Sequence, residues 1–121
     1  ADAHAVALAG LAAARAALHP GVTTGDVYAA WQCVVSSDGA STPLRRHHCG
    51  YLVGIGFPPS WVGGGEVLGI RPGGDTLVVP GMTFHLMSWV NGHVISDTAL
   101  VTPHGAELLT TTPRELLVVT R

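Results

Sequence analysis

Charged residues, lysine and long apolar runs are scarce in this sequence of 121 residues. Only 12% of the residues are charged, and all six basic residues are arginine. Apart from Arg45-Arg46 the arginines are scattered, which excludes the basic face that follows nucleic-acid phosphates. No apolar run reaches the length of about 18 residues that a membrane span needs, so none is predicted.

Cysteine is also scarce. Cys33 and Cys49 are too few for a disulfide framework or a zinc knuckle. No basic stretch precedes the alanine-rich start, as it would in a secretory signal, so we expect a cytoplasmic protein with two reduced thiols. We interpret Cys49, which abuts an apolar run, as a buried free cysteine rather than a nucleophile.

Apolar residues make up 47% of the chain, which predicts one folded domain over residues 1–121. Alanine and leucine dominate Asp2–His19 and predict a first helix. Thr23 and Asp26 have the spacing of a capping box, in which each side chain bonds the other residue's amide. A second helix is therefore predicted from about Thr24 to Ser36.

The rest of the chain consists of short β-branched runs separated by glycine and proline, which predict strands. The predicted strands are Tyr51–Ile55, Thr76–Val79, Thr83–Val90, His93–Thr102, Ala106–Leu109 and Leu116–Thr120. Asn91-Gly92 between two of these runs is typical of a tight β-hairpin. Two helices followed by an antiparallel series of strands indicate an α+β fold rather than alternating βαβ units.

Side-chain alternation in the run Thr83–Val90 separates two faces of a strand. Phe84 and Leu86 share the face expected to be the core, which leaves His85 and Met87 on the other. The strand after the turn carries Ser96 and Asp97 on opposite faces, so only one of this pair can join His85. The spacing alone leaves open which one does, and it also allows a half-exposed hairpin without a site.

The remaining candidates are histidines and a proline-rich loop. Seven histidines are present, but HExxH and CxxC are absent and adjacent His47-His48 point to opposite faces of a strand. We therefore predict no metal site from spacing. Pro58-Pro59 holds the chain extended before Trp61, which suits either one wall of a small-ligand pocket or a packing loop.

Several segments resemble the pita-bread superfamily, which includes creatinase, prolidase, aminopeptidase P and methionine aminopeptidase. They are His47-x-x-Gly50-Tyr51-x-x-Gly54, Val79-Pro80-Gly81-Met82-Thr83-Phe84, Val94–Thr102 and Gly105–Thr110. The similarity runs from Ala3 to about Val118 and covers the carboxy-terminal half of the family's catalytic domain. It implies half of a pita-bread fold, with two N-terminal helices packed on a curved, mainly antiparallel sheet.

The resemblance also bears on metal binding. Metal-dependent members take one histidine and two glutamates from this half of the domain, at the positions of Tyr51, Met87 and Ser96 here. Phenol, thioether and hydroxyl groups do not replace these ligands for a divalent cation. The resemblance therefore implies an enzyme without metal or other cofactor.

Gly50-Tyr51, Arg71-Pro72-Gly73-x-Asp75-Thr76 and Gly81–Met87 are closely similar to the ectoine hydrolase branch, a creatinase-like group that opens a cyclic amidine without metal. This sequence departs from the branch at Ser88, where proline is usual, and at Asp97, which is one methylene shorter than the usual acid.

The resemblance implies a metal-independent enzyme acting on a small cyclic or C–N bonded compound by general acid/base chemistry. The reaction is hydrolysis, or a repurposed elimination or cyclisation in a biosynthetic pathway. We expect His85, Tyr51 and Asp97 to be catalytic, and the substrate to be held by His47, Trp61, Met87 and Ser96.

The alternative is a non-catalytic half-domain, either a binding module or a subunit. A sheet that expects a second half leaves an edge or an apolar face uncovered. Such a half is completed by homodimerisation or by a partner chain that supplies the other half. Neither reading involves nucleic acid or a membrane.

Overall fold

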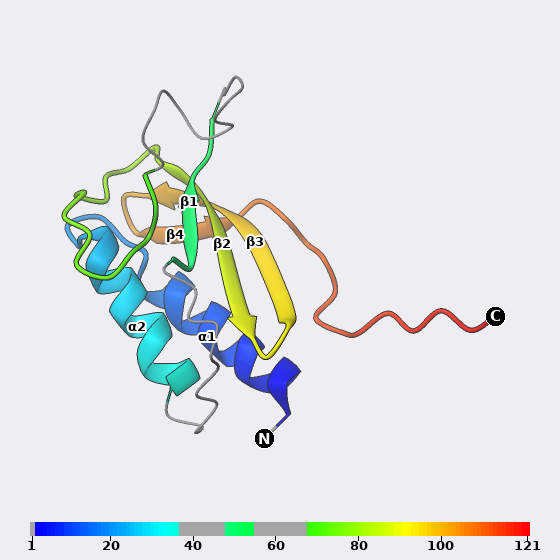
Figure 1. Cartoon of the computed structure of the whole chain (residues 1–121). Coiled ribbons are helices and arrows are strands. Elements are labelled where there is room, and N and C mark those ends of the chain that lie inside the picture. The colour runs from blue at the N-terminus through cyan, green and yellow to red at the C-terminus, as the bar shows by residue number, and fades with distance from the viewer. Residues whose placement is uncertain (1, 37–47, 55–67) are drawn as a thin grey trace, which may run out of the picture.

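In the computed structural model, which describes residues 2–36, 48–54 and 68–121, two helices cover one face of an antiparallel sheet (Figure 1). The elements are α1 (Ala3–Ala17), α2 (Thr24–Ser36), β1 (Gly50–Leu52), β2 (Thr83–Val90), β3 (His93–Thr102) and β4 (Gly105–Leu108). The four strands are ordered β1-β2-β3-β4. This arrangement confirms the α+β class and the two N-terminal helices packed on the sheet.

Both helices begin where their capping residues predict. The carboxylate of Asp2 accepts a hydrogen bond from the His4 amide at 3.1 Å. The Thr23 amide donates to the Asp26 carboxylate at 2.8 Å, and the Asp26 amide donates to the Thr23 hydroxyl at 3.2 Å. These bonds satisfy amides that would otherwise lack partners in the first turn, and they confirm the predicted capping box.

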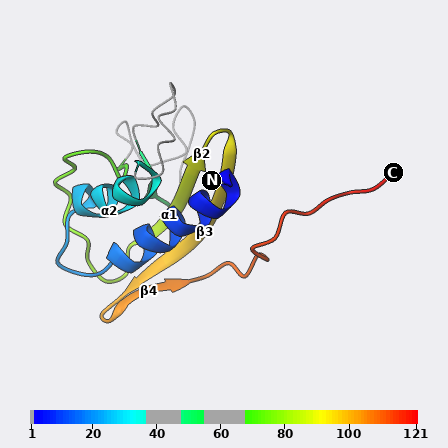
Figure 2. The same ribbon diagram turned by 90° about the horizontal axis from the view of Figure 1, so that it is seen from below.

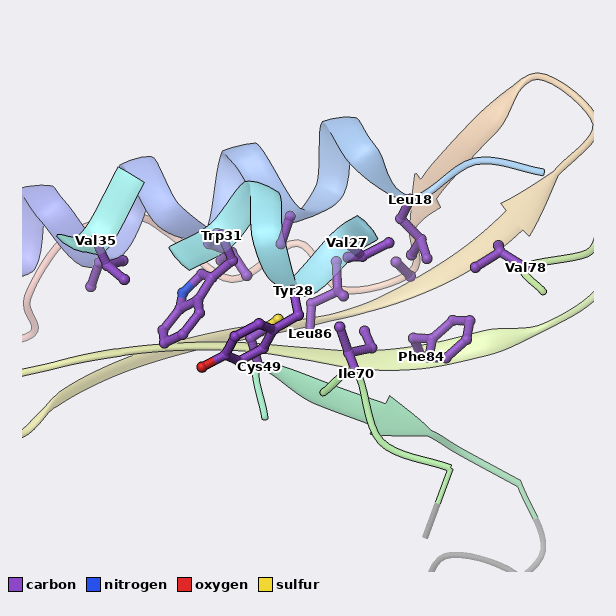
Figure 3. Close-up of a cluster of buried hydrophobic side chains, with 14 of the residues drawn as sticks. Leu18, Val27, Tyr28, Trp31, Val35, Cys49, Ile70, Val78, Phe84 and Leu86 are labelled. Carbon is purple, nitrogen blue, oxygen red and sulfur yellow. The ribbon is translucent and has the colours of Figure 1, made fainter. Parts of the chain in front are cut away.

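The core lies between the helices and the sheet. Every second residue of β2 is buried beneath the helices, and Phe84 and Leu86 are almost completely inaccessible. Figure 3 shows Trp31 and Tyr28 of α2 packed above this strand, together with Cys49 and Ile70. The alternation predicted for β2 is confirmed, and its other face points away from the helices.

Two predicted strands differ from the structure. Thr76–Val79 forms only an isolated bridge between Leu77 and Thr23, because its backbone pairs with the segment that leads into α2. Leu116–Thr120 has no strand partner among the described residues, and Figure 2 shows it running away from the body of the molecule. The residue predicted to end the first strand, Ile55, lies outside the described residues.

No helix in the described part of the chain is long and apolar enough to cross a membrane.

Candidate functional site

The face of the sheet that turns away from the helices collects polar side chains from three strands. The register pairs Tyr51 of β1 with His85 of β2, and His85 in turn with Thr98 of β3. One step along the hairpin, Met87 pairs directly with Ser96. Because paired residues share a face, these five side chains form one surface, which we call the outer face.

A stack of aromatic rings stands at the centre of the outer face. The rings of Tyr51 and His85 lie 5.0 Å apart between centroids with only 25° between their planes. His48 meets Tyr51 edge-on at 6.4 Å and was not among the predicted site residues. The stack fixes the orientation of the imidazole with respect to the phenol.

Gly50 allows β1 to approach β2 closely enough for this stack. A Cβ atom at this position would lie 2.2 Å from the carbonyl oxygen of His85, and the residue has φ +152°. Only glycine fits both the contact and the backbone conformation. The glycine before the tyrosine in the sequence motif therefore positions the ring that stacks on His85.

His85 is half-buried, and its Nε2 atom is inaccessible to solvent. Within the part of the chain that the structure describes, this nitrogen has no hydrogen-bond partner. Burial lowers the pKa of His85 below its ordinary value of 6.5, because the charged imidazolium is the form that loses hydration. A neutral imidazole is able to accept a proton from one bound group and return it to another.

Asp97 lies on the opposite, helix-packed side of the sheet. Its side chain is buried and accepts hydrogen bonds from Thr110 at 2.9 Å and from both terminal nitrogens of Arg114. This ion pair also raises the pKa of Arg114. The structure does not bring Asp97 to His85, which corrects its predicted catalytic placement, and of the two open alternatives Ser96 shares the outer face.

The register that brings Thr98 beside His85 was available in the sequence. A two-residue turn at Asn91-Gly92 pairs Val90 with His93, and each further step outward fixes one more pair. Counting outward from that turn reaches His85 opposite Thr98. The hairpin predicted from Asn91-Gly92 therefore also specifies that Thr98 lies beside His85.

Cys49 is fully buried in the core, and burial raises the pKa of its thiol to about 12. This confirms its interpretation as a buried free cysteine, and a thiol with this pKa is almost entirely protonated near neutral pH. Two predicted substrate-binding residues, His47 and Trp61, lie outside the described residues.

The outer face does not suit a divalent metal ion. No three histidine, cysteine, aspartate or glutamate side chains gather anywhere within residues 2–36, 48–54 and 68–121. The positions where the resemblance expects metal ligands carry the phenol of Tyr51, the thioether of Met87 and the hydroxyl of Ser96. A hard divalent cation prefers carboxylate and imidazole ligands to this set.

Comparisons with known proteins agree with the resemblance in the sequence. The model of metallopeptidase family M24 matches residues 1–103. The chain is 38% identical to an ectoine hydrolase of Halomonas elongata over 103 residues, which are 82% of this chain and 25% of that protein. It is also 38% identical to an uncharacterised hydrolase/peptidase of Sinorhizobium fredii over 106 residues, 84% of this chain and 26% of that protein.

Solved structures share the fold. A dipeptidase from Mycobacterium ulcerans superposes with a TM-score of 0.77 at 28% identity, covering 98% of this chain and 31% of that chain. An X-Pro aminopeptidase from Thermotoga maritima gives a TM-score of 0.78 at 21% identity, covering 98% and 33%. The chain spans about a quarter of the length of the curated relatives that it matches.

Proposed function

The chain belongs to metallopeptidase family M24, and on that premise we propose that its outer face hydrolyses a C–N bond in a small cyclic compound without a metal ion. The observation that carries the proposal is the buried Nε2 of His85, which has no hydrogen-bond partner among the described residues and belongs to the ring that stacks on Tyr51. A buried polar atom without a partner is costly, and a bound substrate or water would relieve that cost.

In this proposal the neutral imidazole of His85 is the general acid/base. It takes a proton from the water that attacks the carbon of the C–N bond, and it returns that proton to the nitrogen that leaves. Tyr51 donates a hydrogen bond to the charge that develops on the attacked group. Met87, Ser96 and the neighbouring Thr98 line the substrate. Asp97 has no part in this proposal.

Two further residues belong to the proposal on sequence grounds alone. They are His47 and Trp61, which we propose as substrate-binding residues. The same acid/base pair would also serve an elimination or a cyclisation in a biosynthetic pathway, because each of these reactions moves one proton off a carbon or nitrogen and onto another atom. A small-molecule substrate and a cytoplasmic location belong to the same proposal.

Metal independence is supported by the chemistry of the outer face. Tyr51, Met87 and Ser96 offer no carboxylate and no imidazole to a metal ion. We therefore assign the proton transfers to His85. The ectoine hydrolase of Halomonas elongata is a relative at 38% identity, which makes a cyclic amidine a reasonable first probe.

A second candidate is a non-catalytic half-domain that is completed by a second copy or by a partner chain. It is favoured by the short span of this chain relative to the solved proteins it resembles, 31% and 33% of their length. A pocket built between two halves requires both of them. Under this candidate the outer face binds its ligand without turnover.

Incubation with ectoine and a panel of small cyclic amidines and amides tests the two candidates, with products followed by chromatography in the presence of a chelator. We expect turnover by the wild type and a fall of at least about a hundredfold in His85→Ala, because a general acid/base usually contributes at least that much to the rate. His104→Gln, which changes an exposed histidine in the turn before β4, is the matched control and should leave turnover intact. Equal turnover by wild type and His85→Ala would refute the mechanism, and binding without turnover would favour the half-domain.

A further inference from the structure

The segment that follows β4 ends in an apolar stretch that the described part of the chain leaves exposed. Leu116, Leu117, Val118 and Val119 are 60%, 82%, 82% and 88% exposed. Four consecutive apolar residues, two of them β-branched, are typical of a strand that is buried on both faces. Figures 1 and 2 show this stretch drawn out from the body, and it has no partner strand among the described residues.

The point at which this tail leaves the body is firmly held. Thr110 and Arg114 both bind the buried carboxylate of Asp97 in β3, and the Leu109 amide donates to the Thr98 carbonyl at 2.8 Å. Figures 1 and 2 show the chain continuing from this anchor away from the sheet. The anchor therefore directs the apolar stretch away from the sheet rather than back onto its own β4.

The tail is not a peculiarity of this chain. The superposition on the Mycobacterium ulcerans dipeptidase covers 98% of this chain, which includes most of the tail, but only 31% of that longer protein. The aligned region thus reaches into the tail, and the other protein has much more structure outside that region. An acceptor for the tail has to come from outside the described residues or from another copy.

The sheet has one open edge that suits such a strand. β4 pairs with β3 on one side and has no strand on the other among the described residues. Ladder bonds alternate along an antiparallel pair, and the bond from Leu109 to Thr98 sets that alternation. The N–H and C=O groups of Ala106 and Leu108 consequently point away from β3.

A cavity lies beside this edge on the helix side of the sheet. Its volume is about 470 Å³, and its apolar walls come from Leu8, Leu11, Ala12 and Ala16 of α1 and from Ala106 of β4. The ion pair of Asp97 and Arg114 also lines it. A strand added to β4 would direct every second side chain into this cavity. The cavity and the tail are therefore complementary in chemistry and in spacing.

We propose that the tail of one copy adds as an antiparallel or parallel strand to β4 of a second copy, with alternate Leu and Val side chains filling that copy's cavity. Reciprocal exchange of the two tails gives a closed twofold dimer. Extended at roughly 3.3 Å per residue, the segment after Arg114 reaches roughly 20 Å, enough to cross to an adjacent molecule. The exchange buries the apolar stretch and satisfies the open edge together.

Charge favours the same arrangement. Arg15 stands at the rim of the cavity and has no ion-pair partner within the described part of the chain. Glu115 directly precedes the apolar stretch, so an incoming tail brings a carboxylate toward this guanidinium. At an exposed rim such a pair contributes little energy, but it helps to fix the register of the added strand.

This inference rests on the homodimer that the second candidate function includes, and it concerns the face of the sheet opposite to His85. Its test is the oligomeric state of the 121-residue chain, measured by sedimentation velocity over a range of concentrations. We expect a dimer for the wild type and for Thr111→Asp/Thr112→Asp, which adds two charges to the exposed tail outside the apolar stretch. We expect Val118→Asp/Val119→Asp to weaken dimerisation by at least about a hundredfold.

The acceptor is tested by Ala106→Pro, which removes an outward N–H from the edge of β4 without breaking the ladder to β3. Circular dichroism establishes that each variant is folded. The introduced aspartates replace side chains that are exposed in the single chain, so we expect them to leave its fold intact. The tail variant and the edge variant are also mixed. One intact tail and one intact edge then meet, so the mixture should dimerise more strongly than either variant alone and more weakly than the wild type.

A wild type that stays monomeric at all concentrations would overturn the inference, as would open-ended oligomers in place of a dimer. A wild-type dimer that tolerates both Val118→Asp/Val119→Asp and Ala106→Pro would overturn the exchange while leaving a homodimer of another kind. Turnover is read out separately through His85→Ala. Failure of the exchange is thereby distinguished from failure of the proposed chemistry.

Discussion

At the scale of single residues, two buried groups with opposite roles stand on opposite sides of one sheet. His85 is half-buried on the outer face with a nitrogen that has no partner among the described residues, whereas Cys49 is packed in the core. Burial disfavours the charged form of both, and it therefore lowers the pKa of the imidazole and raises that of the thiol. Burial thus favours the neutral imidazole of His85, which can accept a proton, and the protonated thiol of Cys49, which is a poor nucleophile.

The proposed mechanism predicts a pH profile. If neutral His85 is the base, kcat/KM rises with pH through the pKa of His85 and is flat above it. Because burial lowers that pKa below 6.5, the rise should be centred below 6.5 and activity should persist at mildly acidic pH. Values of kcat/KM measured from about pH 4 to pH 8 at constant ionic strength test the predicted midpoint of this rise.

The control for that profile is His104→Gln, because His104 lies in an exposed turn and is not one of the five residues of the outer face. This variant should keep the wild-type profile. A rise centred above 6.5, or a profile unchanged in a residually active His85 variant, would contradict the assignment.

The cysteines give a chemical test of burial. Cys33 is exposed on α2 and Cys49 is buried with a pKa of about 12, so a thiol reagent at neutral pH should modify one thiol in the native protein and two after unfolding. Peptide mass mapping identifies the site. Cys33→Ser should abolish native labelling, and rapid native modification of Cys49 would contradict this packing.

At the scale of elements, α1 crosses β2 and α2 at a glycine. A Cβ atom on Gly10 would lie 2.7 Å from Cγ1 of Val35 and 2.8 Å from the hydroxyl of Ser88. That hydroxyl accepts a hydrogen bond from the Trp31 indole at 3.0 Å. Ser88, which departs from the usual proline of the ectoine hydrolase branch, therefore joins α2 to β2 in the core.

Gly10→Ala measures which of two effects prevails. In an open helix this change would stabilise by about 1 kcal/mol, but here the added methyl group meets two packed side chains, and overpacking costs about 1–3 kcal/mol. We expect a net loss of about 1 kcal/mol in urea unfolding. Ala9→Gly on the exposed side of α1 is the control and should lose about 1 kcal/mol through helix propensity alone. A Gly10→Ala protein more stable than the wild type would show that the contact relaxes freely.

Local signals predicted the elements that are defined locally. The structure confirms the predicted capping box at Thr23 and Asp26 and the predicted turn at Asn91-Gly92. Each of these features depends on residues only a few positions apart. Thr76–Val79 was wrong as a strand because its backbone partner is Thr23, far away in the sequence. Strand propensity reports an extended backbone, and it does not report which segment the backbone pairs with.

At the scale of the whole molecule, the sheet separates two surfaces by the parity of its strands. Ser96 faces outward with His85, and its neighbour Asp97 faces inward to anchor Arg114. The sequence predicted this opposition but not its direction, because the choice depends on which face the helices cover. The ion pair by which Asp97 anchors the tail could not be predicted, because no local sequence pattern indicates that Arg114 lies beside Asp97 in the fold.

The absence of metal ligands from Tyr51, Met87 and Ser96 can be tested by introducing the family's ligands at these three positions of the outer face. Tyr51, Met87 and Ser96 come from three adjacent strands, and Met87 pairs directly with Ser96. We expect Tyr51→His/Met87→Glu/Ser96→Glu to place an imidazole and two carboxylates on one surface, where the two opposed carboxylates repel each other until a divalent cation binds. At about a hundredfold excess over Kd, Mn²⁺ should stabilise this variant by about 2–3 kcal/mol.

The control keeps the carboxylates but omits the imidazole, as Tyr51→Phe/Met87→Glu/Ser96→Glu. Thermal melts with and without Mn²⁺ should give a clear rise in Tm for the first variant, a smaller one for the control and none for the wild type, because ligand number and type set the affinity. An equal rise in Tm for the wild type would mean that the natural outer face already binds the cation. In that case the replacement of the family's histidine and glutamate ligands by Tyr51, Met87 and Ser96 would not imply a metal-free reaction, and the proposed acid/base role of His85 would be contradicted.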